Sequence, residues 1–200
     1  MGRFDGITMM SDVDSKTLDA EPAWVGEVIH FWLEELTEAQ WYEKNDYIDS
    51  AIRDRFFSLH ERLVMQDGLG MTEPRPILAA VIVLDQFSRN LFRGDPRAYA
   101  ADPIARRLAR AAIEQGLDIS MTKQERLFLY HPFEHSENRE DQAFSLCLIT
   151  RLDNEDWTQY AIAHKAIIDR FGRFPHRNAV LNRPSTADEL EFLIDPKSSF

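Results

Sequence analysis

Apolar residues recur at spacings of three and four along most of this chain, and the runs begin and end at residues that favour helix termini. The clearest run ends before Gly68, which is typical of a helix stop. Its apolar members are Ile48, Ile52, Phe56, Leu59 and Leu63. No segment alternates apolar and polar residues for long, and no Asn-Gly or Asp-Gly pair links two β-rich runs. The sequence therefore predicts an all-α fold.

The helix starts are marked by short capping patterns. Capping boxes are expected at Thr37 with Gln40, Thr122 with Glu125, and Thr186 with Glu189. Asp95-Pro96 and Asp102-Pro103 each pair a capping residue with a proline suited to the first turn, and Pro132 is expected to break a helix. About eight helices joined by short turns predict stacked antiparallel helical hairpins. Because no strict 34-residue period occurs, any tetratricopeptide-like array is irregular.

Length and composition predict one domain. The chain has 200 residues, of which 44% are hydrophobic, enough for one sizeable core. Residues 1–21 are polar and lack a sustained period, which predicts a disordered or loosely ordered lead. Residues 22–200 are expected to form a single all-α domain. The aromatic residues near its start could form a wall for stacking, but their helical spacing favours positions in the core. They are Trp24, Phe31, Trp32, Trp41 and Tyr42.

The charge of the chain argues against two classes of partner. A net charge of −11 disfavours nucleic-acid and anionic-membrane binding, since both need a basic face. No apolar run is long enough to span a bilayer, and no signal peptide opens the chain. Together with the single cysteine, Cys147, this predicts a reducing, cytoplasmic location. Cys147 itself lies in the apolar run AFSLCLIT and is expected in the core.

Three stretches carry more polar chemistry than helix formation requires. In the first, Leu84 to Tyr99, Asp85, Arg89 and Arg93 follow one another at spacings of four. On a helix the carboxylate of Asp85 supports Arg89, whereas the two arginines repel each other unless an anion lies between them. This pattern predicts either a solvated charged face or the floor of an anion-binding pocket.

The second stretch, Leu129 to Gln142, contains the side-chain types that bind metals. They are His131, Glu134, His135 and Glu137. Pro132 disturbs the helical spacing and the order H-E-x-x-H is absent, so no metal and no other cofactor is predicted. The competing hypothesis is structural, with Ser136 or Asn138 capping the next helix and a glutamate anchoring a positive group.

The third stretch reverses the sign of the chain. From Phe171 to Arg183 there are three arginines and no acid. Arg173 and Arg177 suit a carboxylate or phosphate, His176 suits proton transfer, and Asn178 suits ligand orientation. The alternative is an interior network with no ligand, in which these groups tie the loop to acids elsewhere. His164 lies on an apolar stripe and is predicted to be a hydrogen-bonded interior histidine.

The longer strings of the chain resemble a known bacterial family, the domain of unknown function 924. The similarity runs from about Val25 to Leu193 through HFW, QWY, LDQFSRNLFR, LFLYHPFEHSE and FGRFPHRNAVLNR. It implies an all-α, tetratricopeptide-like fold and no established activity. The polar positions that match the family strings are Asp85, Gln86, Arg89, Asn90, Arg93, His135, Ser136, Glu137, Arg173, His176, Arg177 and Asn178. His131 departs from the family pattern, which disfavours a family-wide metal site that uses it.

Three hypotheses for function follow. The first is a helical scaffold that binds a small anionic molecule or a peptide carboxylate. Its predicted ligand-binding residues are Arg89, Asn90, Arg93, Ser136, Arg173, Arg177 and Asn178. The second is a hydrolase with His135 or His176 as general acid or base, oriented by Glu137 or Asp85. The third is an ionic clamp that only joins helices. A homodimer is compatible with all three.

Overall fold

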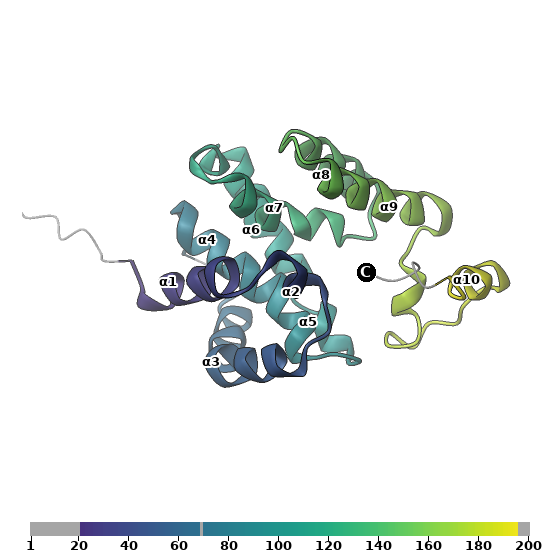
Figure 1. Ribbon diagram of the computed structural model, residues 1–200, viewed down its shortest axis with the longest axis horizontal. Helices are drawn as coiled ribbons and strands as arrows, with labels where there is room; N and C mark the ends of the chain where they lie inside the picture. Colours follow the sequence, from purple (N-terminus) through teal and green to yellow (C-terminus); the bar gives the residue numbers. More distant parts are fainter. Residues whose placement is uncertain (1–20, 69, 196–200) are drawn as a thin grey trace, which may run out of the picture.

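The described part of the molecule is built from helices joined by short turns. In the computed structural model, residues 21–68 and 70–195 are described, and these ranges contain no β-strand. The all-α prediction is therefore confirmed (Figure 1). The lead predicted over residues 1–21 lies outside the described residues except for Glu21. The single domain over 22–200 stays a prediction, as does the likeness to tetratricopeptide proteins.

The helical elements vary in length from single turns to a helix of 20 residues, α3. In chain order, the α-helices are α1 (Ala23–His30), α2 (Glu38–Tyr42), α3 (Asp46–Met65), α4 (Pro74–Val81), α5 (Ser88–Leu91), α6 (Asp102–Glu114), α7 (Lys123–Glu134), α8 (Arg139–Thr150), α9 (Glu155–Phe171) and α10 (Ala187–Phe192). Two π-helical segments, η1 (Phe31–Glu35) and η2 (Ile82–Phe87), continue α1 and α4. The remaining short elements are the 3-10 turns η3 (Pro96–Tyr99), η4 (Leu117–Ser120) and η5 (Pro175–Arg177).

The predicted helix starts and breaks agree with the structure except at Asp102 and Pro132. All three expected capping boxes form, at Thr37, Thr122 and Thr186. Asp102, however, lies inside the first turn of α6 and its carboxylate binds arginine instead of capping. Pro132 does not break α7, which continues to Glu134. The missing Pro132 N–H removes only one hydrogen bond near the end of the helix, so the helix tolerates it.

The core is centred on α4 and η2. Every residue from Ile77 to Ser88 is buried, as expected for a run that is apolar nearly all round. The Phe87 ring packs against Trp32 from η1 and Phe56 from α3, with ring centroids 5.4 and 5.0 Å apart. Cys147 is a correction, since it lies on the exposed face of α8. The periodicity of that helix is amphipathic, and its buried face carries Leu148 and other residues instead.

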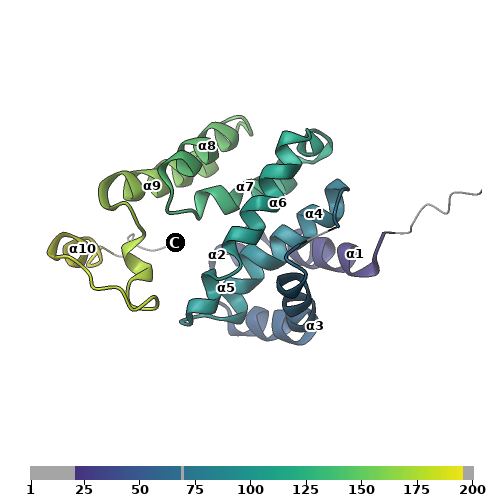
Figure 2. The ribbon, with the colours of Figure 1, turned by 180° about the vertical axis from the view of Figure 1, so that it is seen from behind.

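The last helices extend away from this core and border the candidate site. Helices α8 and α9 lie side by side, and α10 lies at the end of the molecule far from α1, as the two opposite views show (Figures 1 and 2). The segment that leads from α9 to α10 contains η5, and the Phe174 ring of this segment is completely buried. Among the described residues, no helix is long and apolar enough to span a membrane.

Candidate functional site

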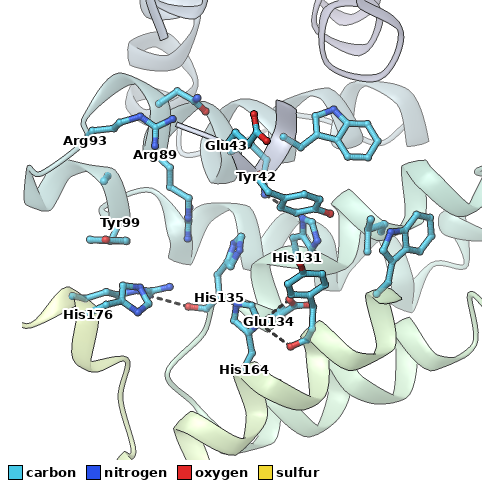
Figure 3. Close-up of a pocket in the computed structure, with 18 of the residues that line it drawn as sticks. Tyr42, Glu43, Arg89, Arg93, Tyr99, His131, Glu134, His135, His164 and His176 are labelled. Atoms are coloured by element: carbon cyan, nitrogen blue, oxygen red, sulfur yellow. Dashed lines mark hydrogen bonds and ion pairs between the residues drawn. The ribbon is translucent and has the colours of Figure 1, made fainter. Parts of the chain in front are cut away.

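A cavity of about 490 Å³ lies where six parts of the chain meet. Its walls come from α2, from η2 with α5, from η3, from α7, from α9 and from η5 (Figure 3). Each of the three polar stretches contributes to it, through Arg89, His135 and Arg177 respectively. The sequence singled out these stretches, but their meeting depends on long-range packing that no local pattern reveals.

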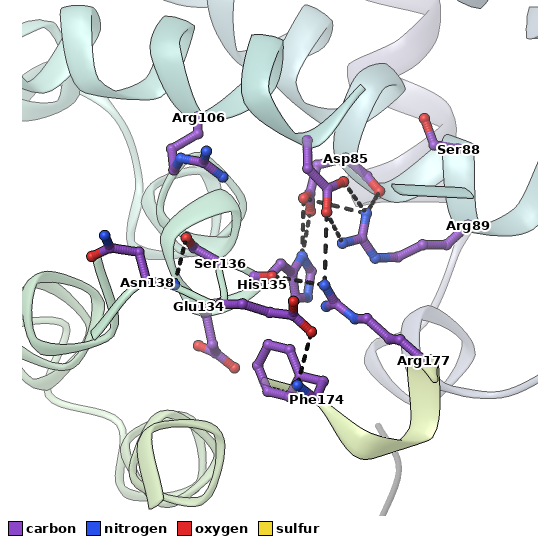
Figure 4. A network of polar contacts seen from close by, with 12 residues as sticks. Asp85, Ser88, Arg89, Arg106, Glu134, His135, Ser136, Asn138, Phe174 and Arg177 are labelled. Atoms are coloured by element: carbon purple, nitrogen blue, oxygen red, sulfur yellow. Dashed lines mark hydrogen bonds and ion pairs between the residues drawn. The ribbon is translucent and has the colours of Figure 1, made fainter. Parts of the chain in front are cut away.

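Asp85 joins two of these stretches beneath the cavity. Its carboxylate is completely buried and accepts from His135 Nδ1 at 2.8 Å (Figure 4). It also accepts from Gln86 Nε2 at 2.6 Å. It also lies 3.4 Å from Arg89 Nη1, as the spacing of four predicts. The hydrogen bond at Nδ1 leaves the other ring nitrogen of His135 without a partner among the described residues, in a side chain that lines the cavity.

Arg89 is neutralised on two sides. Its guanidinium donates to both carboxylate oxygens of Asp102, each at 3.1 Å, in addition to the contact with Asp85. Burial opposes the charge, but the two carboxylates raise the pKa of Arg89 above its ordinary value. Burial also raises the pKa of Asp102, against the pull of Arg89. Asp102 was not among the predicted site residues, because the sequence favoured it as a helix cap.

Arg177 is neutralised far less completely. Its side chain is buried, with the guanidinium carbon 4.6 Å from the Tyr99 ring centroid and 4.4 Å from that of Phe174. Arg177 Nη1 donates to the backbone oxygen of His135 at 3.0 Å, and an Asp102 oxygen lies 4.0 Å away. The Nε atom is buried and has no hydrogen-bond partner among the described residues. Burial, together with repulsion from Arg89, lowers the pKa of Arg177 to about 10.

The histidines that line the cavity are neutral at pH 7. Burial is the main cause in each case, and it lowers the pKa of His131 to about 3 and those of His164 and His176 to about 4. Although Asp85 accepts its Nδ1–H, burial and Arg89 hold the pKa of His135 well below its usual value. The Nδ1 atom of His176 is buried without a partner in the described part of the chain.

Glu134 is a neutral acid among these histidines. Burial first, and then the charge of Asp85, raise the pKa of Glu134 to about 8. Its Oε1 lies 3.1 Å from His164 Nδ1, which is also 2.9 Å from the backbone oxygen of Tyr160. His164 is therefore the hydrogen-bonded interior histidine that the sequence predicts, and it also lines the cavity.

Several predicted ligand-binding residues form hydrogen bonds or ion pairs with other segments of the chain. Asn90 and Arg93 lie at the rim and both donate to Asp49. Ser136 donates to Asp141. Glu137 accepts from Arg183 and from the backbone N–H of Phe174, and Arg173 and Asn178 both donate to Glu189. Neither Arg173 nor Asn178 lines the cavity, so the geometry separates them from Arg177.

A shallow, open depression of the surface adjoins the cavity. Three side chains border both, those of Tyr99, His135 and Arg177. Ser136 and Glu137 border the depression only. Among the described residues, no group of three or more histidine, cysteine, aspartate or glutamate side chains is placed to hold a metal ion.

The aromatic side of the main cavity was not predicted as part of the site. Tyr42 was expected in the core, but it is 52% exposed and lines the cavity together with Tyr160 and Trp157. For Tyr42 the sequence left a stacking wall open as the alternative to a core position, whereas Trp157 was expected on the apolar face of its helix and Tyr160 was given no role. Tyr99 was the end of a polar stretch but received no role of its own.

Comparisons with known proteins identify relatives without assigning an activity. A family model described as "Bacterial protein of unknown function (DUF924)" matches residues 28–197. The chain is also similar to a solved protein of unknown function from Agrobacterium tumefaciens, with 35% identity and a TM-score of 0.81. That match covers 86% of this chain and 97% of the other. No curated protein matches the chain significantly.

Proposed function

The chain belongs to the bacterial DUF924 family, whose description names no activity, and from its cavity we propose that the protein binds a small anionic molecule. One observation carries this proposal. Arg177 is a buried cation that lacks a closely bonded carboxylate. Since an uncompensated buried charge is costly, an anion in the cavity would stabilise this residue.

His176 supports the same proposal. It lines the cavity next to Arg177, and its Nδ1 has no partner among the described residues. A neutral imidazole carries one N–H donor, and protonation beside a bound anion adds a second. The pair Arg177 and His176 therefore offers charge and directed hydrogen bonds from one short segment, η5.

An ionic clamp explains the other arginines of the cavity but not this pair. Arg89 is bonded to Asp102 and Arg93 to Asp49, so both are satisfied without a ligand. Arg177 makes one hydrogen bond to a backbone oxygen, and its Nε remains unpartnered among the described residues. For this reason we place anion binding before a purely structural role.

A panel of anions tests the proposal by thermal unfolding. Sodium acetate, succinate, phosphate and sulfate are compared at matched ionic strength, and at least one is expected to raise the melting temperature of the wild type. A ligand at about 100 times its Kd stabilises a folded protein by about 2.7 kcal/mol. In Arg177→Met, which keeps an apolar stem between Tyr99 and Phe174, this stabilisation should disappear.

Arg97→Met is the matched control. Arg97 also lies over an aromatic ring, 4.5 Å from the Phe92 centroid, and pairs with a carboxylate, but it is exposed and does not line the cavity. The control should respond to the anion as the wild type does. If no anion stabilises the wild type, or if both variants respond equally, anion binding at Arg177 is wrong.

A hydrolase is the second candidate, and the contact between Asp85 and His135 favours it. An aspartate that accepts from Nδ1 fixes the tautomer, so the other ring nitrogen can take a proton from water. We rank it second because a pKa well below the usual value makes His135 a weak base at pH 7.

Turnover of p-nitrophenyl acetate and p-nitrophenyl phosphate tests the hydrolase. The wild type is expected to exceed the buffer rate, and His135→Gln and Asp85→Asn should lose most of that excess, while His30→Gln, a change at an exposed histidine of α1, should keep it. Equal rates for all four proteins would exclude His135 as the base for these ester classes.

A further inference from the structure

The main cavity has two chemically different ends. At one end lie three arginines, Arg89, Arg93 and Arg177, which we call the cationic end. At the other lie the aromatic side chains Trp41, Tyr42, Trp157 and Tyr160, which we call the aromatic end. Figure 3 shows this separation, with Arg93, Arg89 and His176 to one side and Tyr42 to the other.

The aromatic end is held in place by contacts between α2 and α9. The rings of Tyr42 and Tyr160 come from α2 and α9 and are almost parallel, with centroids 6.0 Å apart and an interplanar angle of 13°. Trp157 Nε1 donates to Glu38 at 2.8 Å, so the polar atom of that indole is satisfied. Flat, half-exposed rings held in this way are suited to stack on another planar ring.

The cationic end contains one arginine without a close carboxylate of its own. Arg93 pairs with Asp49, and Arg89 pairs with both Asp85 and Asp102. Arg177 lies 4.0 Å from Asp102, which already binds Arg89. Glu43 also lines the cavity, and it would repel a polyanion such as a nucleoside triphosphate. The charges therefore favour a monoanion.

We infer that the cavity binds an aryl carboxylate, with the carboxylate beside Arg177 and His176 and the planar ring at the aromatic end. This inference rests on the proposed anion binding and specifies its ligand class. The cavity volume of about 490 Å³ lies in the range of sites for small organic ligands, about 300 to 1,000 Å³. An apolar body fixed by a few polar groups is the usual composition of such sites.

Isothermal titration calorimetry with three probes tests the ligand class. The probes are 2-naphthoate, which carries both the ring and the charge, acetate, which lacks the ring, and 2-naphthalenemethanol, which lacks the charge. Because ring burial and ring stacking add to the carboxylate contact, 2-naphthoate is expected to bind at least about tenfold more tightly than either of the others.

The double variant Tyr42→Ala, Tyr160→Ala is expected to lose this advantage of 2-naphthoate over acetate. Both side chains are 52% exposed, so the variant should keep its fold, which circular dichroism checks. Tyr47→Ala is the control, because Tyr47 is 81% exposed and lies outside the cavity. It should keep the wild-type preference for the aryl probe.

The outcomes separate the two proposals. Equal affinities for 2-naphthoate and acetate would overturn the aryl class and leave anion binding intact. Equal affinities for 2-naphthoate and 2-naphthalenemethanol would overturn the role of the carboxylate. If none of the probes and none of the inorganic anions binds, the proposed function fails together with this inference.

Discussion

Asp85 is the residue on which most of the site depends. It is completely buried, and its carboxylate contacts a histidine, a glutamine and an arginine at once. Each of these partners lines the main cavity. A buried carboxylate is stable only while its partners are in place, and the partners in turn are left unpaired when the carboxylate is removed. The geometry of the cavity floor therefore follows from this one side chain.

We expect Asp85→Asn to lower the free energy of unfolding by about 3 kcal/mol, because it breaks a buried ion pair and leaves part of the Arg89 charge uncompensated. Asp49→Asn is the matched control, since Asp49 pairs with the rim residue Arg93 and should cost about 1 kcal/mol or less. Urea unfolding followed by tryptophan fluorescence measures both. A similar cost for the two variants would show that Asp85 is not the organising residue.

At this scale the sequence predicts ion pairs between residues that are neighbours along a helix, but not those between residues of different elements. The spacing of four between Asp85 and Arg89 predicts their contact. The bidentate contact of Arg89 with Asp102 spans another element, and the aspartate's place before a proline favoured a capping role instead. Arg173 shows the same limit. Its charge predicts an anion partner, but only the packing of α10 shows that the partner is Glu189.

At the scale of elements, the helix ends are governed by local chemistry. The capping boxes and the stop at Gly172 are properties of a few consecutive residues, which is why they can be predicted from sequence. Gly172 ends α9 with φ of 70° and turns the chain toward η5, which carries His176 and Arg177. The direction of that segment depends on this left-handed residue.

Gly172→Ala is expected to lower the free energy of unfolding by about 1 kcal/mol, because a Cβ is unfavourable at positive φ. An added Cβ would meet no atom within 4 Å, so the cost is conformational. Gly26→Ala, inside α1 and equally free of contacts, should instead stabilise by about 0.5 to 1 kcal/mol through helix propensity. Thermal unfolding of both variants measures the contrast, and a shared sign would contradict it.

At the scale of the whole molecule, the chain has a net charge of −11, but the walls of its cavity are not predominantly acidic. The cavity walls hold three arginines and a group of neutral titratable side chains. Composition predicts the acidic surface but gives no sign of this group, because its members are far apart in the chain and become neutral only through burial. They are His131, Glu134, His135, His164 and His176. Their response to pH is therefore a property of the complete fold.

The histidines that line the cavity lower the free energy of unfolding as pH falls, and Glu134 lowers it as pH rises. The folded-state pKa values of about 3 to 4 lie below the ordinary 6.5, so the unfolded chain takes up protons first as pH falls. Their contribution to stability is lost between pH 6.5 and about 3. The Glu134 pKa of about 8 lies above the ordinary 4.5, so the unfolded chain loses its proton first as pH rises. Its contribution is lost between pH 4.5 and about 8.

We therefore expect the free energy of unfolding to be greatest near pH 7 and to fall on both sides. Between pH 6.5 and 8 the ionisation of Glu134 should lower the free energy of unfolding by on the order of 1 to 2 kcal/mol, since one pKa unit corresponds to about 1.4 kcal/mol, while the last protons that the histidines lose in the unfolded chain offset a similar amount. Over that interval Glu134→Gln, which cannot ionise, should therefore gain on the order of 1 to 2 kcal/mol relative to the wild type, whereas Glu27→Gln on the exposed face of α1 should follow the wild type. Urea unfolding at a series of pH values measures all three. Parallel curves for Glu134→Gln and the wild type would show that Glu134 is ionised in the folded protein, and the buried contact with His164 would then be an ion pair.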